Sequence, residues 1–312
     1  MKSDLRIMAK ILVTGGAGFI GSHLVKRLVD EGHEVVAMDI LLRGNKIDAE
    51  IMKAIDFYKS DIKDLDEVLD LSEGCDYIFH FAAVLGVDVV ADNPVETMDT
   101  EVIGMQNVVE AAIQHGVKKV IYASTSGIYG HSAISDNVRE NIIVDPRTSY
   151  AIAKRYNEIY LAAQHEEKGL NSVSLRFFNV YGANQDNRMV IPRFIEQAKA
   201  GEPITVFGNG KQTRDFTFID DTIDACITLM TQVDGCEIFN IANEHEYTIL
   251  ELAEMIKKLT QSESEIKFID APKKRYDYEV ERRLGSSEKL YKAIGKKPET
   301  QLVDGLSRIV EG

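Results

Sequence analysis

Thr14-Gly-Gly-Ala-Gly-Phe-Ile-Gly21 is the stretch that decides the fold, because it joins an apolar, β-branched run to a helical run at Phe19–Glu31. Gly15, Gly18 and Gly21 permit a tight turn, close approach of the backbone to a pyrophosphate, and close packing of a helix on a strand. The helix then points the unpaired N–H groups of its first turn at the phosphates. A glycine loop by itself predicts only a tight turn, whereas a strand, this loop and a helix in succession predict a dinucleotide site.

An acidic residue ends the second apolar run, Val35-Val-Ala-Met-Asp39, near the distance at which such folds bind the ribose hydroxyls. Asp39 would repel a 2′-phosphate, so the expected cofactor is NAD rather than NADP. Arg43, four residues later, is the feature that argues for NADP. Asp61 ends the third run, where it either contacts the adenine or caps a turn.

Apolar runs alternate with helical patterns along most of the chain, which predicts an α/β fold with a doubly wound parallel sheet and helices on both faces. Strands are expected at Lys10–Thr14, Glu34–Asp39, Ala54–Ser60, Asp76–Phe81, Lys118–Ser124, Ser172–Phe177 and Glu237–Ala242. Helices are expected at Phe19–Glu31, Leu65–Leu71, Pro94–His115, Ser149–Lys168, Pro192–Ala200, Asp221–Thr231, Ile249–Thr260 and Ser287–Ile294.

The spacing of these runs divides the chain unequally. Residues 1–181 are expected to form an NAD-binding domain, and residues 182–312 a mainly substrate-binding lobe in which strands are sparse. The run near 237–242 is expected to return to the main sheet, so that the smaller lobe is interleaved with the larger one. A chain of 312 residues exceeds the size at which a single core usually stops growing, which agrees with this division.

The composition argues against several classes of protein. A formal net charge of −14 disfavours a nucleic-acid partner, although a local basic pocket can still bind a small phosphorylated ligand. No apolar stretch approaches the length that crosses a bilayer, and residues 1–10 lack the apolar core of an export signal, so a cytoplasmic protein is expected. Cys75, Cys226 and Cys236 are too few and too scattered for a disulfide framework or a zinc site, and no metal is expected.

Tyr150 is the one tyrosine among twelve that has a lysine four residues on, Lys154. Residues at this spacing share one face of a helix. An ammonium beside a phenol favours the phenolate and lowers the pKa of the tyrosine. The pair is therefore either an acid/base device or a surface tyrosine beside a solvated lysine.

Further motifs stand in a fixed order along nearly the whole chain. After Thr14–Gly21 come His80-Phe-Ala-Ala83, Ala123-Ser-Thr-Ser-Gly-Ile-Tyr-Gly130, Tyr150 with Lys154, Arg176-Phe-Phe-Asn-Val-Tyr-Gly182, and Thr213-Arg-Asp-Phe216 before Asp220-Asp221. With them the chain resembles the extended short-chain dehydrogenases/reductases, specifically the NAD-dependent nucleotide-sugar epimerase and dehydratase group. The resemblance implies a Rossmann-like, seven-stranded domain for NAD and a small C-terminal lobe for a nucleoside-diphosphate sugar. It also implies a homodimer built on the helices Pro94–His115 and Ser149–Lys168.

The resemblance assigns roles to individual residues. Tyr150 would deprotonate the sugar hydroxyl at C4, Lys154 would lower the pKa of Tyr150 and hold the nicotinamide ribose, and Thr125 would hydrogen-bond the same sugar oxygen. NAD would contact Gly15, Gly18, Phe19, Ile20, Gly21, Asp39, Asp61, Ile62, Phe81, Ala82, Ala83, Tyr150 and Lys154. The sugar nucleotide would contact Leu85, Thr125, Ser126, Tyr150, Asn179, Arg188, Val190, Arg214 and Arg275.

The residues after Thr125 bear on the choice of reaction. Sugar dehydratases of this group have Asp-Glu where this chain has Ser126 and Gly127, so elimination of water is disfavoured. The loop Ser124–Tyr129 contains no cysteine, which disfavours an epimerase-reductase of the GDP-sugar type. A 4-epimerase acting on a UDP-hexose, UDP-N-acetylhexosamine or UDP-uronate has the fewest catalytic requirements, namely oxidation at C4, rotation of the ketone and return of the hydride. A UDP-sugar dehydratase, a UDP-glucuronate decarboxylase and a non-catalytic NAD-binding protein remain the alternatives.

Two positions depart from the family pattern. Glu101, in Thr100-Glu-Val-Ile-Gly104, stands where the family usually has asparagine, and either alters the electrostatics of the site or lies on a helix surface. Around Arg275 the chain has Arg275-Tyr-Asp-Tyr278 in place of Arg-x-Gly-Asp. Arg188 and Arg282 either reach the substituents at C5 and C6 of the sugar, which would suit a uronate, or lie on the surface.

Overall fold

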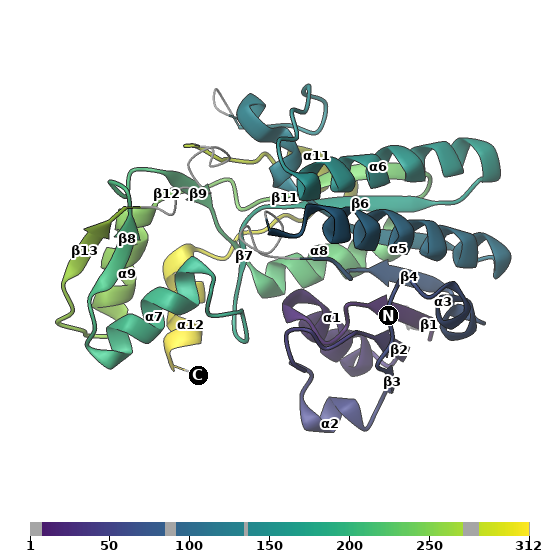
Figure 1. Ribbon diagram of the computed structural model, residues 1–312, viewed down its shortest axis with the longest axis horizontal. Helices are drawn as coiled ribbons and strands as arrows, with labels where there is room; N and C mark the ends of the chain where they lie inside the picture. The colour runs from purple at the N-terminus through teal and green to yellow at the C-terminus, as the bar shows by residue number, and fades with distance from the viewer. Residues whose placement is uncertain (1–7, 85–91, 134–136, 271–280, 312) are drawn as a thin grey trace, which may run out of the picture.

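The computed structural model describes residues 8–84, 92–133, 137–270 and 281–311. Within these ranges seven strands form one parallel sheet in the order β11-β6-β5-β4-β1-β2-β3 (Figure 1). Their bounds are β1 Lys10–Thr14, β2 Glu34–Met38, β3 Asp56–Tyr58, β4 Tyr77–His80, β5 Lys119–Thr125, β6 Ser172–Phe177 and β11 Cys236–Ile241. The predicted doubly wound parallel sheet is confirmed, and each expected strand lies within two residues of its predicted ends.

The sheet is buried on both faces because successive side chains of a strand point to opposite sides. In β1, Ile11 and Val13 belong to one core cluster and Leu12 to another. The first face is covered by α1 (Phe19–Asp30) and α8 (Ile219–Gln232), and the second by α3 (Leu65–Ser72), α5 (Pro94–Gln114) and α6 (Ser149–Lys168). Figure 1 shows α5 and α6 side by side on their face of the sheet.

The ends of the helices beside the sheet are set by local signals. Pro94 occupies the first turn of α5, and Gly116, just past its end, has a φ of 65° that suits glycine. Thr148 caps α6 by accepting the backbone N–H of Ala151 at 3.1 Å, which places residues 149–151 in its first turn. None of the helices in the described ranges is both long enough and apolar enough to span a bilayer.

A second group of elements gathers away from the large sheet, at the left of Figure 1. It contains the strand pairs β8 (Ile204–Phe207) with β13 (Ile266–Ile269) and β9 (Thr213–Asp215) with β12 (Glu246–Thr248). The helices are α7 (Val190–Ala200), α9 (Ile249–Leu259) and α12 (Leu302–Glu311). A third pair, β7 (Val180–Tyr181) with β10 (Thr217–Phe218), lies between this group and the sheet.

The sequence prediction that strands become sparse after residue 182 was wrong. The strands there are two to four residues long, apart from β11, and strands this short leave no apolar run in the sequence. The helical patterns also missed α12, the short α2 (Ala49–Met52) and the 3-10 segment η1 (Ser126–Ala133). The boundary between the two parts at residue 182 stays a prediction. The expected return to the main sheet is seen in β11, which lies at the sheet edge beside β6. Helix α11 (Glu288–Ile294) packs on β11.

Candidate active site

The glycine loop lies at the carboxyl edge of the sheet between β1 and β4, where the strand order reverses. Ligands of doubly wound folds bind in the crevice at such a switch point. Gly15 has a φ of 69°, and a Cβ atom there would lie 2.6 Å from the backbone nitrogen of Ala82. A Cβ atom at Gly21 would overlap the carbonyl oxygen of Gly15. The close packing of this loop against the segment after β4 therefore requires glycine.

The start of α1 is open to an anion. Its N-cap is Gly18, which offers no side chain to the N–H groups of the first turn, and no acidic residue stands in that turn. Phe19, Ile20 and Gly21 supply these N–H groups. Unpaired N–H groups at a helix N-terminus favour a phosphate. This donor set fits the pyrophosphate of a dinucleotide.

Asp39 stands one residue past β2, beside the same loop. Its carboxylate accepts the backbone N–H of Leu41 at 2.8 Å and that of Ala17 at 3.1 Å, which fixes the carboxylate near the start of α1. Burial raises the pKa of Asp39, and the surrounding N–H groups oppose this shift. A fixed anion at this place fits the hydroxyls of a ribose and opposes a 2′-phosphate.

The other residues predicted to contact the cofactor lie near the ends of β3 and β4. Asp61 accepts the N–H of Lys63 at 2.9 Å, an arrangement that caps its own turn. Ile62 lies against Gly104 of α5. Residues 81–83 follow β4, and the N–H of Ala82 donates to the hydroxyl of Thr14 at 3.2 Å, which holds this segment beside the glycine loop.

The end of β5 and the first turns of α6 bring the three predicted catalytic residues together. Tyr150 lies in the first turn of α6, and the ammonium of Lys154 is 5.4 Å from the centroid of its ring. Thr125, the last residue of β5, hydrogen-bonds to the side chain of Tyr150 and accepts the N–H of Gly127 at 3.1 Å. The arrangement places a phenol, a hydroxyl and an ammonium at the edge of the sheet that carries the glycine loop.

The pKa of Tyr150 is raised, opposite to the direction predicted from its lysine neighbour. Burial has the largest effect and the carboxylate of Glu101 adds to it, while the hydrogen bond from Thr125 lowers the pKa. The ammonium of Lys154 is itself paired, with Nζ 3.0 Å from Oε2 of Glu101. The alternative of a solvated surface lysine is excluded, since Lys154 is fully buried.

A buried polar network supports the strand that ends at Thr125. The hydroxyl of Ser124 donates to Glu158 of α6 at 2.7 Å. Glu158 pairs with Arg176 of β6 through two hydrogen bonds of 2.9 and 2.8 Å, and both residues are buried. Arg176 also donates to the hydroxyl of Tyr129 at 2.9 Å. Arg176 belongs to one of the sequence motifs described above, but no sequence pattern predicted its pairing with Glu158.

The residues predicted to bind the sugar nucleotide come from both parts of the molecule. Asn179 lies between β6 and β7, and its carbonyl oxygen accepts the N–H of Thr217. Arg214, in β9, is nearly buried and donates to the carbonyl oxygen of Thr213 at 2.6 Å. Val190 is the first residue of α7, and Ser126 is buried at the start of η1.

Of the remaining residues predicted to contact the sugar nucleotide, two form ion pairs with neighbouring carboxylates and two lie outside the described residues. Arg188 pairs with Asp186, two residues earlier in the sequence, and just over half of its side chain is exposed. Arg282 pairs with Glu246 at 2.8 Å. Leu85 and Arg275 lie outside the described residues.

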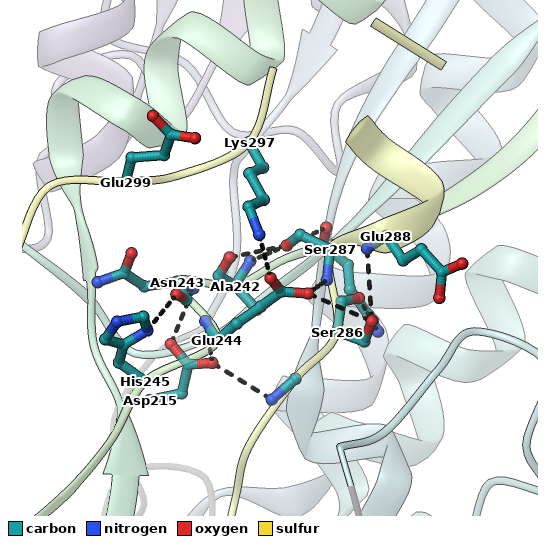
Figure 2. Close-up of polar contacts among 12 residues, drawn as sticks. Asp215, Ala242, Asn243, Glu244, His245, Ser286, Ser287, Glu288, Lys297 and Glu299 are labelled. Atoms are coloured by element: carbon teal, nitrogen blue, oxygen red, sulfur yellow. Dashed lines mark hydrogen bonds and ion pairs between the residues drawn. The ribbon is translucent and has the colours of Figure 1, made fainter. Parts of the chain in front are cut away.

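Asp215, in β9, joins three separate segments of the chain (Figure 2). Its carboxylate accepts the backbone N–H groups of Asn243 at 2.9 Å, Glu244 at 3.1 Å and Gly285 at 3.3 Å. Glu244 in turn accepts the N–H of Ser287 at 2.8 Å. Burial raises the pKa of Asp215 to about 7, although these N–H groups lower it. The carboxylate thus holds β9, which also carries Arg214, against the chain that follows β11 and against the segment at Gly285.

A sequence model of a known family covers most of the chain. The model of the NAD dependent epimerase/dehydratase family matches residues 11–242. That range contains the glycine loop, the end of β5 and the first turns of α6.

Individual proteins are similar over most or nearly all of their length. A UDP-N-acetyl-alpha-D-glucosaminuronate decarboxylase of Bacillus cytotoxicus is 38% identical over 265 residues, with 82% of each chain covered. A putative UDP-glucose 4-epimerase of Methanocaldococcus jannaschii is 33% identical over 306 residues, covering 96% of this chain and 97% of that one. The crystal structure of UDP-glucose 4-epimerase from Thermotoga maritima, solved with UDP-glucose, matches with a TM-score of 0.91 at 33% identity and covers 97% of both chains. The similarity therefore extends to proteins named for two different reactions.

Proposed function

Because the chain belongs to the NAD dependent epimerase/dehydratase family, we propose that it is a 4-epimerase that acts on a UDP-sugar by transient oxidation at C4. The observation that carries this proposal is the meeting of Thr125, Tyr150 and Lys154 at the sheet edge that also bears the glycine loop. The substrate is a UDP-hexose, a UDP-N-acetylhexosamine or a UDP-uronate.

The protein residues divide the work of the reaction. When bound, NAD supplies the acceptor for the hydride at C4 and the donor that returns it. Tyr150 takes the proton of the C4 hydroxyl as the hydride leaves and gives it back at the end. Thr125, which hydrogen-bonds Tyr150, orients the same hydroxyl. Lys154 holds the hydroxyls of the nicotinamide ribose.

The cofactor contacts follow from the crevice between β1 and β4. The N–H groups at the start of α1 bind the pyrophosphate, and Asp39 binds the adenosine ribose. The remaining contacts are proposed for Gly15, Gly18, Phe19, Ile20, Gly21, Asp61, Ile62, Phe81, Ala82 and Ala83.

The sugar nucleotide is proposed to lie between the large sheet and the second group of elements. Arg214 suits the diphosphate because its planar guanidinium pairs two phosphate oxygens at once, and Asn179 binds beside it. The sugar is proposed to contact Leu85, Ser126, Val190 and Arg188, and Arg275 to bind the nucleotide.

The residues after Thr125 favour epimerisation over elimination of water. Ser126 is buried and Gly127 has no side chain, so this turn offers neither a strong acid nor a strong base. A 4-epimerase needs only the oxidation, rotation of the ketone and return of the hydride. A second candidate, decarboxylation of a UDP-uronate, shares the oxidation step and is favoured by the 38% identity to the Bacillus cytotoxicus decarboxylase.

The test is incubation of the purified protein with UDP-hexoses, UDP-N-acetylhexosamines and UDP-uronates, followed by NMR of the products. Interconversion of gluco and galacto forms without net formation of NADH supports the proposal. Release of carbon dioxide from a UDP-uronate with no epimerised product would replace it with the decarboxylase, and loss of water would replace it with a dehydratase.

Two tyrosines of α6 provide a matched pair of variants. Tyr150→Phe should abolish turnover and leave NAD binding intact, because it removes the proposed base alone. Tyr156→Phe should leave turnover unchanged, since the one hydrogen bond of that hydroxyl within the described residues comes from Gln106, at 3.4 Å on the outer surface. Turnover retained in Tyr150→Phe contradicts its assigned role.

The same helix also supports a proposed homodimer through α5 and α6. These helices pack together and expose the isoleucine side chains of Ile103, Ile113, Ile152 and Ile159. Exposed apolar side chains on adjoining helices are typical of a protein interface. Light scattering should give about twice the chain mass of 34.9 kDa, and Ile159→Lys should reduce it to that of one chain. A monomeric mass for the unchanged protein would contradict the dimer.

A further inference from the structure

The proposed function leaves unused the buried carboxylate of Glu101. This residue lies on α5, has no exposed surface, and places Oε2 3.0 Å from the ammonium of Lys154, which is equally buried. Asn157 fixes the backbone at this point, since its side-chain amide donates to the carbonyl oxygen of Glu101 at 3.0 Å.

The ionisable groups around this carboxylate come from three elements. Lys154 and Tyr150 belong to α6, and Tyr122 belongs to β5 and has its ring 4.8 Å from the ammonium of Lys154. His80 of β4 stacks on Tyr122. Burial lowers the pKa of His80 to about 3 and raises the pKa of Tyr122, so both are neutral near pH 7. Among the described residues, Lys154 is therefore the cation that faces Glu101.

One buried ammonium can balance one buried anion. A net charge in a buried site is costly because it has lost its hydration. Two groups compete for the ammonium of Lys154, namely the carboxylate of Glu101 and the phenolate of Tyr150. Burial raises the pKa of both groups, and the charge on Glu101 raises the pKa of Tyr150 further. Ionisation of one group therefore favours protonation of the other.

We propose that Glu101, Lys154 and Tyr150 form a triad in which the two acidic groups share one ammonium, so that before the sugar reacts one of them is ionised and the other holds a proton. This proposal rests on the role of Tyr150 in the proposed function. When Tyr150 is ionised and ready to take the proton of the C4 hydroxyl, the carboxyl group of Glu101 carries the proton. When Tyr150 holds the proton, Glu101 is ionised and paired with Lys154. The change from one state to the other breaks the O–H bond of one group and forms that of the other, with the proton exchanged through solvent.

The triad makes Glu101 a positioning residue for this proton rather than a group that touches the substrate. During turnover Tyr150 takes the proton of the C4 hydroxyl and later returns it, while the carboxyl group of Glu101 keeps its own proton. It also fixes the pH at which the phenolate appears, since the ionised carboxylate opposes the phenolate.

The decisive measurement is the pKa of Tyr150 in the NAD-bound protein. It is obtained from an NMR titration of the protein with its tyrosines labelled with carbon-13 at Cζ. The signal is assigned by its loss in Tyr150→Phe. Glu101→Gln keeps the shape and removes the charge, so the pKa of Tyr150 should fall by about one unit or more. The acid limb of the pH profile of kcat/KM should move down by the same amount. An unchanged or raised pKa of Tyr150 overturns the proposal.

Glu101→Asp is the matched variant, because it keeps the charge and alters the packing. It should retain most of the raised pKa of Tyr150, and a fall as large as that in Glu101→Gln would assign the effect to packing and overturn the triad. Because the NMR titration needs no substrate, it is independent of the reaction. Turnover retained in Tyr150→Phe would refute the proposed base, while the effect of Glu101→Gln on the Tyr150 signal would still decide the triad.

Discussion

The buried pair of Arg176 and Glu158 allows a quantitative prediction. Arg176→Met removes the guanidinium and leaves the carboxylate of Glu158 in the core, where both groups are almost completely buried and joined by hydrogen bonds of 2.9 and 2.8 Å. Removal of one partner of a buried ion pair costs about 3–5 kcal/mol, because the remaining charge stays buried without compensation.

The contacts that remain set the lower end of this range. The hydroxyl of Ser124 still donates to Glu158 at 2.7 Å, and the guanidinium of Arg155 still lies 2.9 Å away, although about a third of its side chain is exposed. We therefore expect a loss of about 3 kcal/mol. With an unfolding entropy of about 2.1 cal/mol/K per residue over 312 residues, this lowers the melting temperature by about 5 °C.

The assay is thermal unfolding followed by circular dichroism at one fixed concentration of NAD. Arg155→Met is the matched control, since it removes a partly exposed partner of the same carboxylate and should cost less than about 1 kcal/mol. Arg176→Met combined with Glu158→Leu should be more stable than Arg176→Met alone, because no buried charge is left. The reasoning is refuted if Arg176→Met costs no more than Arg155→Met, or if the second change adds to the loss.

Three further predictions concern other parts of the molecule. Gly21→Ala should weaken NAD binding about tenfold or more in calorimetric titration, because its methyl group would push α1 away from Gly15; unchanged binding would contradict the packing of the loop. Asp39→Asn should reduce the preference for NAD over NADP by about tenfold or more, measured by the two dissociation constants, and an unchanged ratio would exclude Asp39 from the ribose site. The pKa of Asp215 is raised to about 7 in the folded protein, so the folded state binds the extra proton and the contribution of this group to stability falls as the pH rises from about 4 to 7. Urea unfolding across this range should show the fall, and Asp215→Asn should remove it; an equal slope in both proteins would contradict the shift.

The parts of the fold that the sequence predicted are those with local causes. The bounds of β1, β6 and α6 agree with the prediction to the residue, because apolar runs, the Thr148 cap and Gly169 act on their own neighbours. The pairs β8 with β13 and β9 with β12 were missed, since each strand is short and is stabilised by a partner more than 30 residues away in the sequence. Pairing of this kind leaves no period in the sequence to detect.

The candidate site shows the same limit. The spacing of Tyr150 and Lys154 predicted that they share a helix face, and the structure places the ammonium beside the ring. The raised pKa of Tyr150 could not be predicted, because its cause includes Glu101, which belongs to another helix and reaches Lys154 only through the packing of α5 on α6. The role of Asp215 could not be predicted either, since the three backbone N–H groups that it accepts lie 28 to 70 residues away along the chain.

The position of β11 at the edge of the large sheet has a consequence for how such a protein can be recombined. The chain builds six strands, crosses to the second group of elements, and returns to add β11 beside β6 through the register of Asn240 with Arg176. No single cut separates the two parts, and a chain ended after β6 would leave that strand as an open edge, where other chains add by pairing. The second group of elements therefore cannot be exchanged with that of a relative as one continuous segment. A chimera has to keep β11 and replace the stretches on either side of it, so the exchanged segments have to remain compatible with the edge of the large sheet.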